Sequence, residues 1–159
     1  MEAAHLPRAH PRQADGNGVP GARGRVLWTT TYVAKSLWRD DLVFAKFCID
    51  HDLKLEALRR LLEWRLEIDH DWRVKPGVYG RGLKRLLPAD LWSELAATYV
   101  GPEIEDNWAA LWRTTALFRR VAGEVGVALG YAYPQRVDDR VSAYLNAIRQ
   151  LPPAEDAGS

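Results

Sequence analysis

The stretch EIEDNWAALWRTTALFRRVAGEVGVAL, residues 103–129, decides the fold class of this chain. Apolar and small residues recur in it at steps of four and three, the spacing of one face of an α-helix: Ile104, Trp108, Leu111, Thr115, Phe118, Ala122, Val125 and Leu129. Gly130 follows directly, and glycine is favoured just past a helix end. The stretch therefore predicts one long helix with a single buried face, ended by Gly130.

Residues 26–82 predict three more helices and a loop. A first helix covers residues 26–38, and the acidic pair 40–41 offers an N-cap for a second helix through about residue 49. Asp52 can cap a third helix, which runs to about residue 68. Pro76 and three glycines place a loop over residues 70–82.

Helical segments also fill the rest of the chain. Residues 83–87 form a short turn of helix, and Pro88 stands where a helix through Tyr99 begins. A last helix, ended by the proline pair 152–153, carries an apolar stripe: Val137, Val141, Tyr144, Leu145 and Ile148. No segment shows sustained β-alternation. The predicted fold is therefore all-α, a helical bundle of about five to six helices with a disordered N-terminal leader.

Composition divides the chain into one domain and two terminal segments. Turn and breaker residues dominate residues 1–25, which predicts a disordered leader. Residues 26–151 form the helical domain, and residues 152–159 are a polar tail. Four of the tryptophans fall within helical patterns and are expected in the core: Trp64, Trp92, Trp108 and Trp112.

Charge and hydropathy exclude several classes of protein. The chain is 47% hydrophobic and 27% charged, as folded proteins are, and its net charge of +1 predicts no strong attraction to nucleic acid or an anionic membrane. No apolar run approaches the roughly 20 residues of a membrane span, and no signal peptide is evident. A cytoplasmic protein is expected. The single cysteine, Cys48, is expected to be a buried hydrophobe.

The densest group of functional side chains lies in residues 31–42. Helical spacing places Tyr32, Lys35 and Arg39 on one face, with Trp38 and the acidic pair at its end. Aromatic walls beside carboxylates suit a polycationic, hydroxylated ligand, because rings stack and acids pair with guanidinium or ammonium groups. A helix junction with surface ion pairs is the other interpretation.

Two Asp-His-Asp sequences, residues 50–52 and 69–71, contain the Asp-x-Asp pattern that holds magnesium in nucleotidyltransferases. Both fall at predicted helix ends, and neither follows a Gly-Ser turn. Helix-end capping is therefore favoured, and no metal site is predicted. Arg65 and His70 also form the Arg-x4-His pattern of the helical HEPN ribonucleases, which leaves RNA cleavage as an alternative. The basic stretch 74–85 has no Walker spacing.

An ordered series of motifs resembles the C-terminal half of the aminoglycoside 6-adenylyltransferase (streptomycin adenylyltransferase) family. The series extends with few gaps from about Trp28 to Leu151. The matching pieces are YVAKSLWRD (32–40), FAK (44–46), LRRLLEW (58–64), GVYGRGLK (77–84), TY (98–99), WAAL (108–111), LFR (117–119) and LGYAYP (129–134).

The resemblance implies a two-domain enzyme that transfers AMP from ATP to an aminoglycoside hydroxyl. Its N-terminal domain binds ATP and magnesium through Gly-Ser and Asp-x-Asp, and its helical C-terminal domain completes the aminoglycoside pocket. No motif of this chain binds these cofactors, because the matching part begins after the ATP-binding half. The family often carries lysine where Val78 stands and glutamate where Asp41 stands.

The resemblance also suggests site residues. Asp41 is the candidate catalytic base or ligand of a streptidine guanidinium group, with Asp40 as its neighbour. Tyr32 and Trp38 would contact the substrate rings. The candidate phosphate contacts are Lys35, Lys46 and Arg81.

The sequence leaves three functions open. The chain is first interpreted as a truncated substrate-binding domain, inactive alone or dependent on a partner that supplies the nucleotidyltransferase half. A non-catalytic ligand-binding or protein-binding module and a HEPN-like ribonuclease are the alternatives. Without the N-terminal half of the family, an apolar face of the first helix would be uncovered, which predicts self-association or limited solubility.

Overall fold

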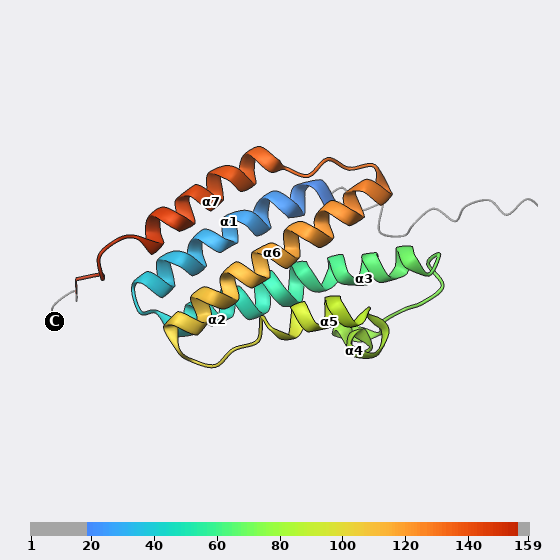
Figure 1. Cartoon of the computed structure of the whole chain (residues 1–159), viewed down its shortest axis with the longest axis horizontal. Helices are drawn as coiled ribbons and strands as arrows, with labels where there is room; N and C mark the ends of the chain where they lie inside the picture. Colours follow the sequence, from blue (N-terminus) through green and yellow to red (C-terminus); the bar gives the residue numbers. More distant parts are fainter. Residues whose placement is uncertain (1–18, 156–159) are drawn as a thin grey trace, which may run out of the picture.

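The computed structural model describes residues 19–155, and this part of the chain is helical, without strands (Figure 1). The elements are α1 (Val19–Trp38), α2 (Leu42–Lys46), the π-helix η1 (Phe47–Leu58), α3 (Arg59–Asp69), the 3-10 turn η2 (Val78–Gly80), α4 (Leu83–Leu86), α5 (Ala89–Ala96), α6 (Ile104–Leu129) and α7 (Gln135–Arg149). The all-α prediction is confirmed. With α2, η1 and α3 taken as one continuous segment, the predicted helix number also holds for the described residues.

The helices pack as a bundle around one core. Helix α1 lies beside α7 and η1, and α6 packs against α3, α1, η1 and α5 (Figure 1). The core consists mainly of leucine, valine and isoleucine side chains, among them Leu27, Val33, Ile49, Leu53, Leu58, Leu62, Leu91, Leu111, Leu117, Val121 and Leu145. Burying each such side chain stabilises the fold by about 1.5–3 kcal/mol relative to leaving it exposed.

Helix α6 has the buried face that its sequence predicts. Trp108, Leu111 and Phe118 are buried, and the end residues Ile104 and Leu129 pack partly buried against the core. Gly130 adopts the left-handed conformation with φ 77°, and the amide of the next residue donates to the carbonyl of Gly126. The predicted end of the helix is confirmed.

Cys48 is buried, as predicted. Its burial, and to a lesser extent the negative charge of Asp52, raises the pKa of its thiol.

Helix α1 begins earlier than the sequence predicts. The predicted leader extends through residue 25, but residues 19–25 are already helical. Pro20 lies in the first turn. Because N–H groups of the first turn have no acceptor within the helix, the N–H that proline lacks costs no helical hydrogen bond. The remaining leader residues, 1–18, and the tail residues 156–159 lie outside the described part of the chain.

The predicted break before Asp52 is wrong. The chain stays helical from Leu42 to Asp69, and the middle of this segment is the π-helix η1. Nothing in residues 47–58 is proline or glycine, so no residue interrupts the helix. Its buried side chains Ile49, Leu53 and Leu58 are spaced by four and five residues, which suits the wider i→i+5 turn.

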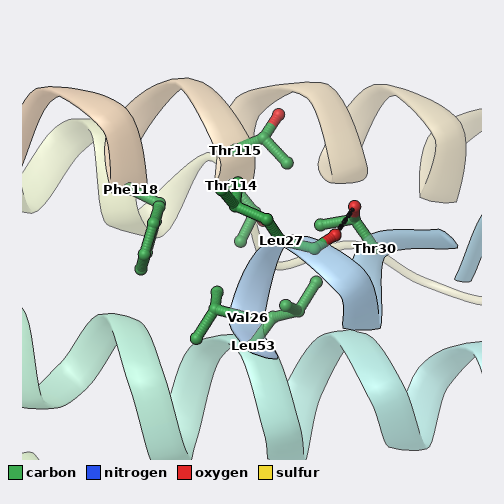
Figure 2. A pocket seen from close by; sticks show the side chains of 7 residues that line it. All are labelled: Val26, Leu27, Thr30, Leu53, Thr114, Thr115 and Phe118. Atoms are coloured by element: carbon green, nitrogen blue, oxygen red, sulfur yellow. Dashed lines mark hydrogen bonds between the residues drawn. The ribbon is translucent and has the colours of Figure 1, made fainter. Parts of the chain in front are cut away.

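A small gap in the core lies between α1, η1 and α6 (Figure 2). Thr30, Thr114 and Thr115 line it, but their hydroxyls donate to backbone carbonyls of their own helices. The remaining lining is apolar: Val26, Leu27, Leu53 and Phe118. These hydroxyls are already paired within their helices, so the gap is a poor site for a polar ligand.

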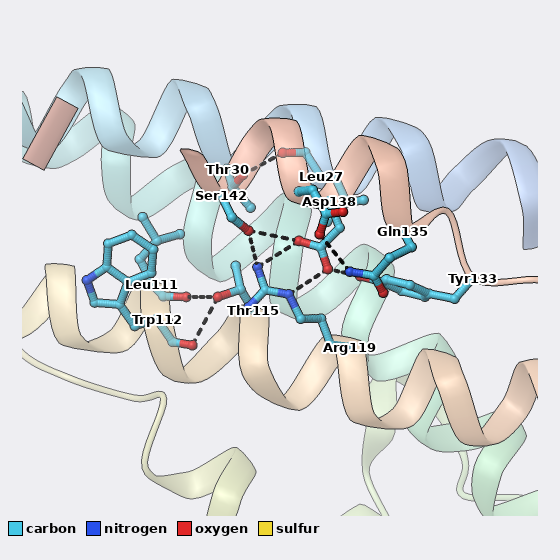
Figure 3. Close-up of polar contacts among 11 residues, drawn as sticks. Leu27, Thr30, Leu111, Trp112, Thr115, Arg119, Tyr133, Gln135, Asp138 and Ser142 are labelled. Atoms are coloured by element: carbon cyan, nitrogen blue, oxygen red, sulfur yellow. Dashed lines mark hydrogen bonds and ion pairs between the residues drawn. The ribbon is translucent and has the colours of Figure 1, made fainter. Parts of the chain in front are cut away.

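An ion pair with a buried carboxylate joins α6 to α7 (Figure 3), and its arginine side chain is 35% exposed. The Arg119 guanidinium donates to both oxygens of Asp138, at 2.6 and 2.7 Å. The hydroxyls of Tyr133 and Ser142 also donate to this carboxylate, which is only 2% exposed. Burial opposes ionisation, but the hydrogen bonds outweigh it and lower the pKa of Asp138. The pair therefore fixes the last helix onto the bundle.

Candidate functional site

The turn between α1 and α2 carries the acidic pair 40–41 in a closed backbone motif. Asp40 adopts the left-handed conformation with φ 60°. Its amide donates to the carbonyl of Leu37 at 3.2 Å, and the amide of Asp41 donates to that of Ser36 at 2.7 Å. This is the hydrogen-bond pattern of a Schellman helix end, in which aspartate is one of the few non-glycine residues tolerated. These hydrogen bonds thus fix the backbone positions of both acidic residues.

Both carboxylates of this pair are exposed, and within the described residues neither has a hydrogen-bond or ion-pair partner. Asp41 does occupy the predicted N-cap of α2, but its side chain makes no capping hydrogen bond. Buried acids elsewhere, such as Glu63 and Asp138, are paired with arginines. The turn therefore presents two negative charges that the fold itself does not neutralise.

A lysine between two tyrosines lies on α1 in the turns before this acidic pair. The Nζ atom of Lys35 is 6.0 Å from the ring centroid of Tyr32 and 5.7 Å from that of Tyr144 on α7. Tyr32 is 54% exposed, so one ring is available to a ligand. The predicted shared face of Tyr32 and Lys35 is confirmed. Tyr144 was predicted only as part of an apolar stripe, because its spacing does not reveal which helix it meets.

Trp38 connects α1 to the C-terminal segment. Its side chain packs half-buried against the core, and its Nε1 atom donates to the carbonyl of Pro152 at 2.8 Å. The pyrrole N–H is therefore occupied by the protein itself. Only the remaining part of the ring is available for the predicted substrate contact.

Lys46 binds the segment that follows α5. Its ammonium group donates to the carbonyl of Val100 at 3.1 Å and lies 3.2 Å from the carboxylate of Asp50. Lys54, on η1, pairs with the same carboxylate, donates to the carbonyl of Thr98 and lies 3.8 Å from the ring centroid of Tyr99. Burial lowers the pKa of Lys54. These two lysines hold the α5–α6 link in place.

Arg81 lies apart from the other candidate cations. It belongs to the loop that leads into α4, beside α3 and α5, whereas Lys35 and Lys46 lie near the α1–α2 turn (Figure 1). The structure therefore does not bring the three predicted phosphate contacts together.

The carboxylates of the two Asp-x-Asp sequences are largely engaged with neighbouring side chains. Asp50 pairs with lysines, Asp52 lies 2.8 Å from the ring of His51, and Asp69 pairs with Arg65. Asp50 and Asp52 lie inside η1, so the predicted helix-end capping by this pair is wrong. Across residues 19–155, no group of three or more His, Cys, Asp or Glu side chains is arranged to hold a metal ion.

The Arg-x4-His pattern is split between two environments. Arg65 donates to Glu124 on α6 at 2.7 Å and pairs with Asp69, while His70 is exposed at the end of α3. The guanidinium therefore connects α3 to α6.

None of the described helices is long and apolar enough to cross a membrane.

Comparison with known proteins gives consistent matches. The family model described as streptomycin adenylyltransferase matches residues 25–148. The aminoglycoside 6-adenylyltransferase of Campylobacter jejuni is 36% identical over 124 residues, which are 77% of this chain and 41% of that protein. The protein of the same name from Bacillus subtilis (strain 168) is 31% identical over 121 residues, 75% of this chain and 41% of that one.

The solved structures agree in fold. The crystal structure of an aminoglycoside 6-adenyltransferase from Bacillus subtilis superposes with a TM-score of 0.74 at 26% identity, covering 82% of this chain and 49% of that one. The chain thus spans between two fifths and one half of the length of these relatives. Since the family model covers most of the described helices, the chain belongs to the streptomycin adenylyltransferase family.

Proposed function

We propose that this chain is the aminoglycoside-binding half of an enzyme that transfers AMP from ATP to a hydroxyl group of streptomycin. The relatives are named as aminoglycoside 6-adenylyltransferases, which supports this class of reaction. The observation that carries the proposal is the unpaired acidic pair 40–41 at the end of α1.

The chemistry of streptomycin matches this turn. Its streptidine ring carries two guanidinium groups, and a guanidinium pairs strongly with a carboxylate through two parallel hydrogen bonds. Asp40 and Asp41 offer carboxylates that have no partner among residues 19–155 to give up. Tyr32 offers an exposed ring face, and the free part of Trp38 would border the same pocket. Asp41 would either bind a guanidinium or accept the proton of the reacting hydroxyl.

Lys35 best fits a role in neutralising phosphate. Its ammonium group contacts only aromatic rings among the described residues, whereas that of Lys46 is already bonded to Val100 and Asp50. Arg81 would reach the same phosphates only if the nucleotide extended along the bundle. We therefore rank Lys35 first among the three proposed contacts.

Magnesium does not fit the described residues of this chain, because the acids of both Asp-x-Asp sequences are not grouped as ligands. We propose that ATP and magnesium are held by a nucleotidyltransferase half equivalent to the part of the relatives that this chain does not match. That half would be a separate domain, and the chain by itself would not catalyse transfer.

Adenylyl transfer tests this proposal. We expect the chain, mixed with ATP, magnesium and streptomycin, to release no pyrophosphate above background. Addition of the unmatched half of the Bacillus subtilis relative should restore release, and the Asp41→Asn variant should abolish the restored activity. Activity of the chain alone would contradict the division into two halves.

Exposed apolar side chains near the acidic pair predict self-association. Val43 is 85% exposed, and the rings of Phe44 and Phe47 are about half exposed and lie 6.4 Å apart between centroids. Trp28 on α1 is also exposed. Such neighbouring apolar groups favour burial against another surface. We expect sedimentation to show dimers of the chain, and the Phe44→Ser, Phe47→Ser double variant to be monomeric. A monomer at every concentration of the unaltered chain would contradict this expectation.

A further inference from the structure

Five cations are concentrated between α3 and α5. Residues 72–89 contain Arg73, Lys75, Arg81, Lys84 and Arg85 and no acidic residue. All five side chains are exposed. The net charge of the whole chain is only +1, so the rest of the chain is net acidic. The expectation of no attraction to nucleic acid rests on that average, which conceals this basic loop (residues 73–85).

The fold does not neutralise these charges. Within the described residues none of the five has an ion-pair partner, and Lys84 contacts only the ring of Trp92, at 5.7 Å. Six arginines elsewhere in the described part of the chain do form ion pairs. The paired ones are Arg59, Arg60, Arg65, Arg119, Arg120 and Arg149. Unpaired like charges repel one another, and an anionic ligand removes that repulsion.

The basic loop has a defined conformation that holds an aromatic ring outward. The amide of Gly82 donates to the carbonyl of Pro76 at 2.7 Å, which closes the loop. A Cβ atom at Gly82 would meet that carbonyl oxygen at 2.7 Å, so the close approach requires glycine. Tyr79 adopts φ 51° and is 68% exposed, with the guanidinium of Arg59 5.6 Å from its ring centroid. A ring presented among cations can stack on a base.

The basic loop is separate from the acidic pair. The acidic pair lies at the C-terminal end of α1, a helix of 20 residues and thus about 30 Å long, and the basic loop lies toward the other end of the bundle (Figure 1). A ligand at the basic loop would therefore bind independently of the proposed aminoglycoside pocket.

We propose that the basic loop binds single-stranded nucleic acid through its phosphate backbone, with Tyr79 stacking on a base. Small-molecule sites are concave and enclose their ligand, whereas these side chains are all exposed. An open surface gains affinity from many weak phosphate contacts, which an extended polyanion supplies and a single nucleotide does not.

Fluorescence anisotropy with labelled oligo(dT) and oligo(rU) of about 15 nucleotides in about 50 mM salt tests this proposal. We expect binding that weakens steeply with salt. The Lys75→Ala, Arg81→Ala double variant should bind at least roughly tenfold more weakly, with a salt slope smaller by about 1.4, because each single-strand phosphate contact contributes about 0.7. The matched control is Arg136→Ala, Arg140→Ala on α7, whose exposed arginines have no partner among the described residues. It should stay within about twofold.

Three results would overturn the proposal. The first is no salt-dependent binding by a chain that circular dichroism shows to be folded. The second is an equal loss in the α7 control. The third is displacement of the oligonucleotide by ATP or pyrophosphate at equal phosphate concentration, which would identify a small phosphate ligand instead.

Discussion

Replacing Arg119 with leucine is expected to lower the free energy of unfolding by about 3–5 kcal/mol, because it leaves a buried carboxylate without its cation. The Asp138 side chain is 2% exposed and receives two hydrogen bonds from Arg119. The hydroxyls of Tyr133 and Ser142 remain in the variant, but neither carries a charge. Urea denaturation at neutral pH measures the difference.

The next residue of α6 provides a matched control. Arg120 forms three ion pairs, with Asp90, Glu94 and Glu124, but all of these groups are at the surface. Exposed ion pairs contribute about 0–1 kcal/mol, so Arg120→Leu should cost far less although it removes more contacts. Equal losses for the two variants would show that the α6–α7 pair is not a buried electrostatic contact.

The decrease in the free energy of unfolding caused by Arg119→Leu should also depend on pH. The pKa of Asp138 is lowered in the folded protein, so its ion pair stabilises the fold above the unfolded pKa, about 3.9. That contribution disappears as pH falls through the lower, folded value. Without Arg119 the carboxyl is protonated more readily, so the difference in stability between the two proteins should shrink as pH falls and vanish below the folded pKa of Asp138, which lies under the unfolded value of about 3.9. A difference that is constant with pH would point to lost packing instead.

Replacing Asp40 and Asp41 with asparagine is expected to weaken streptomycin binding by roughly ten- to a hundredfold for each residue, since a hydrogen bond to a charged group contributes about 1.5–3 kcal/mol. Asparagine tolerates the left-handed conformation of residue 40 and the N-cap position of residue 41. The substitutions therefore remove charge and keep the turn. Unfolding free energy should change by no more than about 0.5 kcal/mol.

An exposed acid outside the acidic pair separates charge from position. Asp106, in the first turn of α6, is exposed and has no partner among the described residues. Asp106→Asn should bind streptomycin as the unaltered chain does. If it weakens binding as much as Asp41→Asn, the attraction comes from overall charge and not from a pocket at the acidic pair.

Periodicity predicted the fold because the helices are amphipathic and their ends carry specific residues. The buried face of α6 and its end at Gly130 are both evident from spacing. The misplaced boundaries have local causes. Turn and breaker residues predict a leader through residue 25, but the first turn of a helix accepts Pro20. Asp52 predicts a helix cap, but it lies within an uninterrupted π-helix.

The site was predictable in part. Residues close in sequence, such as Tyr32 and Lys35, share a helix face, and helix geometry alone is enough to predict this. The contacts of Trp38 with Pro152 and of Lys35 with Tyr144 span more than a hundred residues, and they depend on which helices pack together. No spacing rule supplies that information. For the same reason the family resemblance suggests Arg81 and Lys46 together as phosphate contacts, although the fold separates them.

Calorimetric titration of the unaltered, folded chain with streptomycin tests the proposed pocket most directly. We predict saturable binding of one molecule per chain, lost or strongly weakened in Asp41→Asn and retained in Asp106→Asn. No binding heat from a chain that circular dichroism shows to be helical, repeated at two temperatures, would contradict the presence of an aminoglycoside pocket at the end of α1.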